Sequence, residues 1–320
     1  MKTVWVLVPQ GVLDSSLSIT LDLLRVAQSL LASSKSPLRF DFRVLGATRT
    51  VRTGGGLTLR TDTTFALATG EPDWVIVPAL GEFGSQLDEH LRARDAVQAQ
   101  ALLRSLAARR KCHIAASCAS VFLLANAGLL DGRSATTTWW LADDFRRRFP
   151  AVRLDESRMV VRDARLLTAG SAFAQLDLML ALLAELAGPR IAQACAQYMV
   201  IDRRPSQARY MMAAHSRRHD PVVAHAERWI DEHLATGVTV ASLARQMAVS
   251  EKTLSRRVQA ATGLSPTRFV QRRRVLLATH LIETTRLPID EVAARVGYRD
   301  SAALRRLIRR ELDTRPSALR

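Results

Sequence analysis

Apolar and polar residues follow one pattern in the N-terminal part of the chain and a different one in the C-terminal part. Short apolar runs without strict alternation occur at Val4–Val8, Phe40–Leu45, Trp74–Val77 and His113–Ala116. Runs of this kind are typical of buried parallel strands. Helix-length stretches lie between and after them, at Leu17–Leu31, Ala93–Arg109 and Ala119–Ala127. This alternation predicts a doubly wound α/β sheet of the flavodoxin-like class.

Further elements extend this predicted domain. Arg158–Val161 and Arg165–Thr168 flank Arg162-Asp163-Ala164 and indicate a hairpin added to the sheet. Helices over about Phe173–Ala187 and Arg190–Val200 follow, with Gly188-Pro189 as the break between them. We therefore expect an α/β domain over residues 1–201, a polar linker over 202–221 and an all-α domain over 222–320.

The all-α part contains the same helix-turn-helix pattern twice. Val240-Ala241-Ser242-Leu243-Ala244 matches Ile289-Asp290-Glu291-Val292-Ala293 at an offset of 49 positions. Later positions match at an offset of 50, namely Leu254, Val258 and Pro266 with Leu304, Ile308 and Pro316. Two short helical readers joined by one long helix are suited to gripping two adjacent turns of duplex DNA.

The second helix of the first copy is predicted over Glu251–Ala261, between a Ser250 cap and a stop at Gly263. Its inward face consists of Leu254, Val258 and Ala261, and its outward face of Lys252, Arg256 and Gln259, with Thr253 and Ser255 on the shoulders. Arginine for guanine edges and small hydroxyls for close approach are what a major-groove helix needs.

The corresponding helix of the second copy is predicted over Ser301–Leu312. Its inward set is Leu304, Leu307 and Ile308; its DNA-facing set is Ser301, Ala302, Arg305, Arg306 and Arg309. Because Ala302 stands where the first copy has Lys252, we expect fewer base contacts here and arginines that grip phosphates.

Charge supports this interpretation. The chain of 320 residues has a formal net charge of +16. Residues 1–188 carry 22 Lys/Arg against 18 Asp/Glu, whereas residues 189–320 carry 24 against 12. The positive excess thus lies in the part with the repeat, where it can neutralise phosphates.

This C-terminal stretch resembles the AraC/XylS family of transcription regulators. The resemblance rests on Ser250-Glu251-Lys252-Thr253-Leu254-Ser255-Arg256-Arg257-Val258, Gly263-Leu264-Ser265-Pro266, Arg274, Ile289-Asp290-Glu291-Val292-Ala293 and Val296-Gly297-Tyr298. It implies a linker helix, about Pro266–Thr284, that places the two readers in successive major grooves about one turn (~34 Å) apart. It assigns base contacts to the positions of Lys252, Ser255 and Arg256, and of Ala302, Arg305 and Arg306.

A candidate chemical site lies where the fourth predicted strand ends. Cys118 is flanked by small residues in Ala116-Ser117-Cys118-Ala119-Ser120, as a sharp strand-to-helix turn requires. We expect the dipole of the helix that begins there to favour the thiolate. A lone cysteine after a strand is also typical of a small core residue.

The segment from Ala115 to Arg133 resembles the cysteine elbow of the PfpI-like, class I glutamine-amidotransferase-like superfamily. Enzymatic members carry a His in a Thr-Thr-His-Trp run as base for the cysteine. This chain has Thr136-Thr137-Thr138-Trp139, and a threonine cannot take a proton at neutral pH. The resemblance also implies an acidic residue on the first helix close to the thiol, which we match to Asp22.

We therefore expect the elbow to form the floor of a ligand pocket rather than a catalytic centre. The candidate lining residues are Asp22, Cys118, Thr138 and Trp139, and sheets of this kind bind ligands beyond the carboxyl ends of their strands. A Trp beside an acid could hold a cationic amine. Trp139 and Trp140 as plain packing residues fit the sequence equally well.

Together the two resemblances imply a DNA-binding transcription regulator of the amidotransferase-like subgroup of AraC regulators, whose α/β domain senses a small, for example nitrogenous, metabolite. The implied partners are double-stranded promoter DNA, the effector, a second copy in a homodimer, and RNA polymerase; no cofactor or metal is expected. Two alternatives stay open, a cysteine-dependent hydrolase or amidase fused to a DNA-binding domain and a thiol redox sensor using Cys118.

The expected location is the cytoplasm. Cys112, Cys118 and Cys195 form no CxxC pair, which indicates a reduced chain. The apolar start Met1–Val8 is broken by Pro9 and too short for a signal peptide. Asp177 and Glu185 interrupt the best apolar stretch, so no membrane span is expected.

Overall fold

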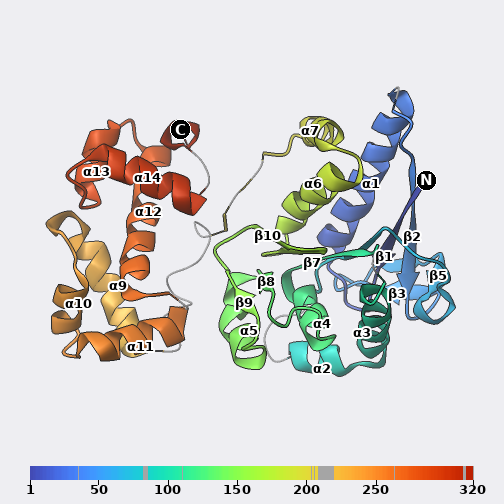
Figure 1. The fold of residues 1–320 in the computed structure, drawn as a ribbon, viewed down its shortest axis with the longest axis horizontal. Coiled ribbons are helices and arrows are strands. Elements are labelled where there is room, and N and C mark those ends of the chain that lie inside the picture. The colour runs from blue at the N-terminus through green and yellow to red at the C-terminus, as the bar shows by residue number, and fades with distance from the viewer. Residues whose placement is uncertain are drawn as a thin grey trace. The chain divides into compact units, whose positions relative to one another are not determined.

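The computed structural model describes residues 1–34, 36–81, 86–109, 111–202, 204, 206–207, 220–262, 264–312 and 315–319. The chain divides into two compact units, residues 1–207 and 208–320, and each is described by itself (Figure 1). Most of the predicted linker and the predicted helix stop at Gly263 lie outside the described residues.

The first unit is built on a seven-stranded sheet with the order β10-β11-β7-β6-β1-β2-β5. Its strands are β1 (Lys2–Leu7), β2 (Phe40–Gly46), β5 (Thr63–Thr64), β6 (Trp74–Val77), β7 (His113–Ser117), β10 (Val160–Asp163) and β11 (Leu166–Ala169). All neighbours are parallel except β10 and β11. The four predicted strands and the added hairpin are confirmed, and β11 joins the sheet by pairing with β7.

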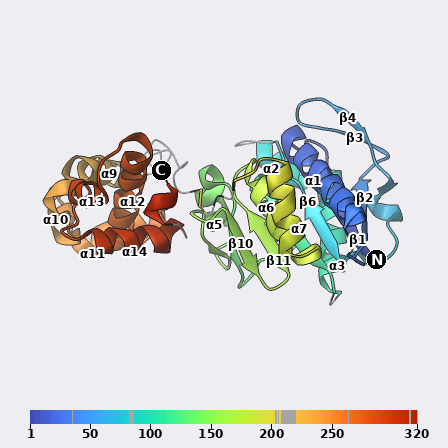
Figure 2. The same cartoon turned by 90° about the horizontal axis from the view of Figure 1, so that it is seen from above.

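Helices cover both faces of this sheet, as a parallel sheet requires. On one face, α1 (Asp14–Ser33), α6 (Ala174–Leu186) and α7 (Pro189–Tyr198) pack against Val4 and Val6 of β1. On the other face, α2 (Gln86–Arg92), α3 (Arg94–Ala107), α4 (Val121–Asn126) and α5 (Ala142–Arg148) pack against Trp5 and Leu7. Figure 2 shows α1, α6 and α7 together over the sheet. Alternate residues of one strand thus enter two separate cores.

Several short elements have too few residues to show a period in the sequence. They are the ribbon β3 (Thr50–Arg52) with β4 (Thr58–Arg60), the pair β8 (Ser134–Ala135) with β9 (Arg153–Leu154), α2, α5, and the 3-10 turns η1 (Phe65–Leu67), η2 (Cys118–Ser120) and η3 (Trp139–Leu141). The helix predicted over Ala119–Ala127 begins as η2, and only Val121–Asn126 is α-helical.

The second unit consists of helices around two small cores. Its elements are α9 (Pro221–His233), η5 (Leu234–Thr236), α10 (Val240–Gln246), α11 (Glu251–Thr262), α12 (Pro266–Thr284), α13 (Ile289–Arg295), α14 (Ser301–Leu312) and η6 (Pro316–Ala318). Phe269 and Val270 of α12 enter the core shared by α9, α10 and α11. Val275, Ala278 and Ile282 of the same helix enter the core shared by α13 and α14. One long helix therefore carries both helix-turn-helix motifs, as predicted.

Among the described residues, no helix is both long enough and apolar enough to cross a membrane.

Candidate nucleic-acid interface and candidate ligand site

Helix α11 is fixed by its cap and by its inner face. The Thr253 N–H donates to Ser250 Oγ at 3.1 Å, and the Ser250 hydroxyl donates to Thr253 Oγ1 at 2.9 Å. Leu254 and Val258 are completely buried, whereas Ala261 is only half-buried. Lys252, Ser255 and Arg256 lie exposed on the outer side, so the predicted reading face is turned to solvent.

Helix α14 is arranged in the same way. The Ala302 N–H donates to the Asp300 carboxylate at 2.8 Å, which satisfies the start of the helix. The inward set of Leu304, Leu307 and Ile308 is buried. Arg305, Arg306 and Arg309 are exposed, and Ser301 and Ala302 are half-buried.

The basic side chains on these two outer faces differ from other arginines of the unit. Arg257 pairs with Asp220 at 3.3 Å, Arg273 with Glu227 at 2.7 Å and Arg310 with Glu311 at 3.0 Å. In contrast, no described acidic residue forms an ion pair with Lys252, Arg256, Arg305, Arg306 or Arg309. Their charge is therefore available to an external anion such as a phosphate.

The two motifs are braced through Arg274 of α12. Its guanidinium lies 4.9 Å from the ring centroid of Tyr298, which follows α13, and it donates to the Val238 carbonyl before α10 at 3.4 Å. Gly297 has a φ of +81°, and a Cβ there would lie 2.1 Å from the Leu234 carbonyl oxygen. The backbones of the two halves therefore approach each other closely at a position that only glycine can occupy.

In the first unit, Cys118 occupies the strand-to-helix turn predicted for it. Its φ is +54°, in the left-handed region that side chains rarely adopt. The turn is held from both sides, because the Cys118 N–H donates to the Gly170 carbonyl at 2.8 Å and its own carbonyl accepts from the Thr137 hydroxyl at 2.8 Å. A strained elbow is thus present at this position.

The expectation that the thiolate is favoured is wrong. The residue is only 3% exposed, and burial raises the pKa of the Cys118 thiol to about 11, outweighing the Ala119 N–H and the nearby Thr138 hydroxyl, which act to lower it. The adjacent helical turn is short, so it adds little to offset the loss of hydration. The thiolate is the reactive form of a cysteine, so burial of this kind lowers the reactivity of Cys118 at neutral pH.

Of the three residues matched around the thiol, Thr138 lies beside it. Thr138 is completely buried. Trp139 follows directly and is half-buried, with its ring at 90° and 5.3 Å to that of Trp140.

Asp22 is the residue that the structure places elsewhere. Its side chain is 55% exposed and lies 3.8 Å from Arg25. The buried stripe of α1 runs through Ser16, Thr20, Leu23 and Leu24, and Asp22 is off that stripe. The assignment of Asp22 to the pocket is therefore wrong. The hypothesis of a cationic amine held between an acid and Trp139 required Asp22, so it loses its acidic residue.

A buried polar chain reaches the elbow from α1 instead. The Ser117 hydroxyl donates to Gln175 Oε1 at 2.5 Å, and Gln175 Nε2 donates to Thr20 Oγ1 at 2.8 Å. On the far side of the turn, the Ser120 hydroxyl donates to the Pro78 carbonyl at 2.6 Å. Sequence reasoning missed Thr20 and Gln175, although the i, i+4 spacing of Ser16 and Thr20 within the apolar stripe was a usable signal.

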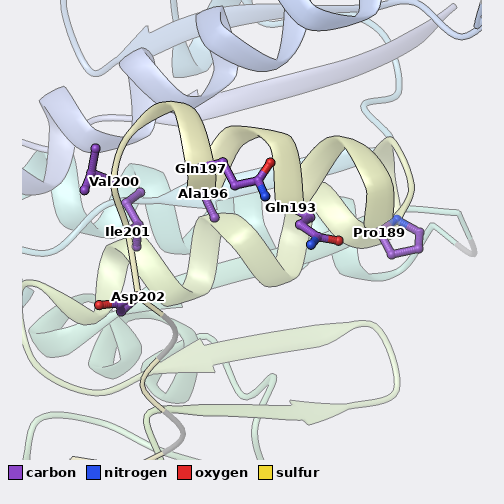
Figure 3. A pocket seen from close by; sticks show the side chains of 7 residues that line it. All are labelled: Pro189, Gln193, Ala196, Gln197, Val200, Ile201 and Asp202. Atoms are coloured by element: carbon purple, nitrogen blue, oxygen red, sulfur yellow. The ribbon is translucent and has the colours of Figure 1, made fainter. Parts of the chain in front are cut away.

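Two grooves lie away from the elbow. One, with a volume of about 700 Å³, follows α7 and the residues after it (Figure 3); it is lined by Pro189, Gln193, Ala196, Gln197, Val200, Ile201 and Asp202. The other, of about 250 Å³, borders α14 in the second unit; it is lined by Ile282, Pro288, Ile289, Arg305, Pro316 and Ser317. Neither is lined by Cys118, Thr138 or Trp139.

Comparison with known proteins agrees with this division. The model of the DJ-1/PfpI family matches residues 2–185, which include the whole sheet and the cysteine elbow. The chain belongs to the DJ-1/PfpI family. In this DJ-1/PfpI protein a helix-turn-helix domain model also matches residues 243–320.

Curated relatives match parts of it. HTH-type transcriptional regulator CdhR of Pseudomonas aeruginosa is 29% identical over 204 residues, covering 61% of this chain and 59% of CdhR. HTH-type transcriptional activator RhaS of Salmonella schwarzengrund is 36% identical over 92 residues, covering 29% of this chain and 33% of RhaS. The matches thus span less than two thirds of either relative.

Solved structures of the DJ-1/PfpI family share the α/β fold. Drosophila melanogaster DJ-1beta is 22% identical with a TM-score of 0.51, covering 63% of this chain and 99% of its own. A ThiJ/PfpI family protein from Pseudomonas syringae is 21% identical with a TM-score of 0.52, covering 82% and 91%. At this identity the likeness establishes the fold alone.

Proposed function

We propose that this protein is a sequence-specific, DNA-binding transcription regulator. The observation that carries the proposal is the pair of capped helices α11 and α14, which both pack on α12. Their outer faces bear basic side chains that form no ion pair with a described acidic residue. Lys252, Thr253, Ser255 and Arg256 form the base-reading set of the first motif. Ser301, Arg305, Arg306 and Arg309 form the more electrostatic set of the second. The names of CdhR and RhaS support the same function.

Replacement of Arg256 tests this function directly. Arg256→Ala removes a side chain that lies on the outer face of α11, so affinity for the specific promoter fragment should fall by roughly 10–100-fold, the value of one bidentate base contact. The matched control is Arg228→Ala, because Arg228 is also an exposed arginine and lies on α9 of the same unit. Equal binding by both variants in a gel-shift titration would contradict the proposal, as would an absence of binding to any fragment around the protein's own gene.

We further propose that the α/β domain, residues 1–201, senses a small molecule and catalyses no reaction. Thr138 stands where a base would be needed, and the neutral, buried Cys118 supports the same conclusion. The test is Cys118→Ala, which should leave DNA binding unchanged. Any ester or amide turnover by the wild type that is lost in this variant would revive the hydrolase alternative.

The remaining partners follow from this proposal. A regulator with two motifs per chain is expected to act in the cytoplasm as a homodimer on promoter DNA, where it can meet RNA polymerase. Sedimentation of the full chain at micromolar concentration tests the dimer, and a monomer with full operator affinity would exclude it.

A further inference from the structure

Several residues after position 201, in the segment that the sequence predicts to be a linker, are attached to the α/β unit. We assigned residues 202–221 to a linker, yet Gln207 is completely buried. Two other described linker residues are also anchored. Arg204 donates from its backbone and its guanidinium to the Asp177 carboxylate, at 3.0 and 2.7 Å, and the Ser206 hydroxyl donates to the Ser157 carbonyl at 2.7 Å.

The Gln207 side chain enters a slot that fits a primary carboxamide. Its Nε2 donates to the Thr137 carbonyl at 2.9 Å and, more weakly, to Thr136 Oγ1 at 3.4 Å. Its Oε1 accepts from the Ser171 N–H at 3.2 Å. The slot thus offers acceptors to an amide nitrogen and a donor to an amide oxygen.

Space for this amide depends on Gly170. A Cβ at Gly170 would lie 2.3 Å from Gln207 Oε1 and 2.5 Å from Nε2. No φ in the left-handed region requires a glycine there, so the missing side chain serves the close approach of the amide rather than the backbone conformation.

The slot borders the cysteine elbow directly. Thr137 and Gly170, which contact the Gln207 amide, are the two residues that hold the Cys118 backbone from either side. Thr138, whose side chain is completely buried, is the next residue along the chain. This is the carboxyl end of β7 and β11, where a sheet of this type binds its ligand.

We propose that Gln207 is an internal occupant of the sensor's ligand site and that the effector is a small molecule bearing a primary carboxamide, which replaces the Gln207 amide in the slot. Displacement frees Ser206 and Gln207 from the α/β unit, so Arg204 becomes the last described residue of this segment that is anchored to it. Binding is thereby converted into a longer tether for the DNA-binding unit. This regulatory consequence rests on the proposed function, whereas the occupancy of the slot does not.

Two variants of the full-length protein test whether Gln207 occupies the slot and whether the slot binds a carboxamide. Gln207→Ala empties the slot, and Gly170→Ala fills it with a methyl group so that the wild-type Gln207 side chain cannot enter. Both should speed hydrogen exchange of the backbone N–H at position 207 by about tenfold or more. In the wild type this N–H donates to the Ser157 carbonyl at 2.9 Å. Gln197→Ala, at an exposed glutamine of α7, is the matched control and should leave this exchange unchanged.

Acetamide, which reproduces the Cγ and carboxamide removed by Gln207→Ala, is the ligand probe. At millimolar concentration it should restore slow exchange in Gln207→Ala but have no effect in Gly170→Ala. If hydrogen exchange at position 207 is unchanged in both variants, Gln207 is not an internal occupant of the slot. If exchange becomes faster in Gln207→Ala and the amide probe does not slow it again, the slot is not a carboxamide site. Neither readout needs an operator or an effector, so each outcome is distinct from a failure of DNA binding.

Discussion

At the scale of single residues, the cysteine elbow shows how one backbone geometry can serve different chemistry. Cys118 has the strained φ of a nucleophile turn, yet the residue is buried in the core and only 3% exposed. Since the thiolate cannot be hydrated there, the strain positions the Cys118 backbone between Thr137 and Gly170 instead of activating its sulfur. Gln207 contacts both of these supports, which is why we propose it as the occupant of the ligand site.

The thiols provide a first prediction. Burial raises the pKa of Cys112, Cys118 and Cys195 to about 11 each. In native protein at about pH 8, Ellman's reagent should therefore react with none of the three on the timescale on which a free thiol is consumed. The denatured chain is the control and should show three reactive thiols. Rapid modification of native Cys118 would contradict the buried elbow and favour the redox-sensor alternative.

The same shifts predict a loss of stability in alkali. The unfolded chain releases its thiol protons near the ordinary pKa of 9.0, whereas the folded chain keeps them to about 11. Stability from this source is therefore complete below pH 9.0 and is lost as the pH rises toward 11. Urea midpoints measured across this range should fall, and a triple Cys→Ala variant should show a smaller fall than the wild type.

At the scale of elements, the hydrophobic period was enough where an element was long. The predicted helices over Pro266–Thr284 and Ser301–Leu312 agree with α12 and α14 at both ends. Each has a capping residue, a stretch of helix length and an apolar face, and together these predict where the helix begins and ends. Helix α5 and the β3–β4 ribbon escaped notice because they hold too few residues for a period, and their positions depend on the layers they pack against.

The close approach at Gly297 provides an element-scale prediction. Gly237 has a similar φ of +88° but nothing within 4 Å of its Cβ position, whereas a Cβ at Gly297 meets the Leu234 carbonyl. Gly237→Ala should cost only the left-handed strain, about 1 kcal/mol of unfolding free energy. Gly297→Ala should cost about 2–4 kcal/mol, since the backbones must also separate.

Chemical denaturation and DNA titration of both variants check this. At a temperature where both are folded, Gly297→Ala should also weaken specific DNA binding, because it shifts one motif relative to the other. Equal losses of stability in the two variants would show that the two halves are not held together at this point.

For the whole molecule, the net charge of the chain governs the predicted DNA binding, and the anchor at Arg204 governs the stability of the first unit. The net charge of +16 predicts DNA binding that weakens steeply with salt. Arg309→Ala should lower affinity about equally for specific and non-specific fragments and reduce the slope of log K against log salt by roughly 0.9. Gel-shift titrations at several salt concentrations measure both. An unchanged slope would mean that Arg309 contacts no phosphate.

The anchor between the linker and the sheet unit gives a second molecular prediction. The side chain of Asp177 is only 6% exposed and that of Arg204 23% exposed. Arg204→Ala leaves a buried carboxylate without its cation and should destabilise the first unit by about 2 kcal/mol at neutral pH. Burial already raises the pKa of Asp177, and loss of Arg204 raises it further, so the deficit should shrink as acid protonates the carboxyl. Asp177→Asn in the same background should recover part of the loss, as measured by thermal unfolding.

The two folds, the repeated motif, the outward basic faces of α11 and α14 and the position of the elbow could all be predicted from the amino-acid sequence. Each of these depends on residues close together in the chain, whose spacing maps directly onto a helix face or a strand end. The burial of Cys118, the outward position of Asp22 and the burial of Gln207 could be seen only in the folded chain. These depend on which distant segments meet, since desolvation and hydrogen bonding are set by neighbours in space. The cysteine elbow is therefore visible in the sequence, but the glutamine that occupies the space beside it is visible only in the fold.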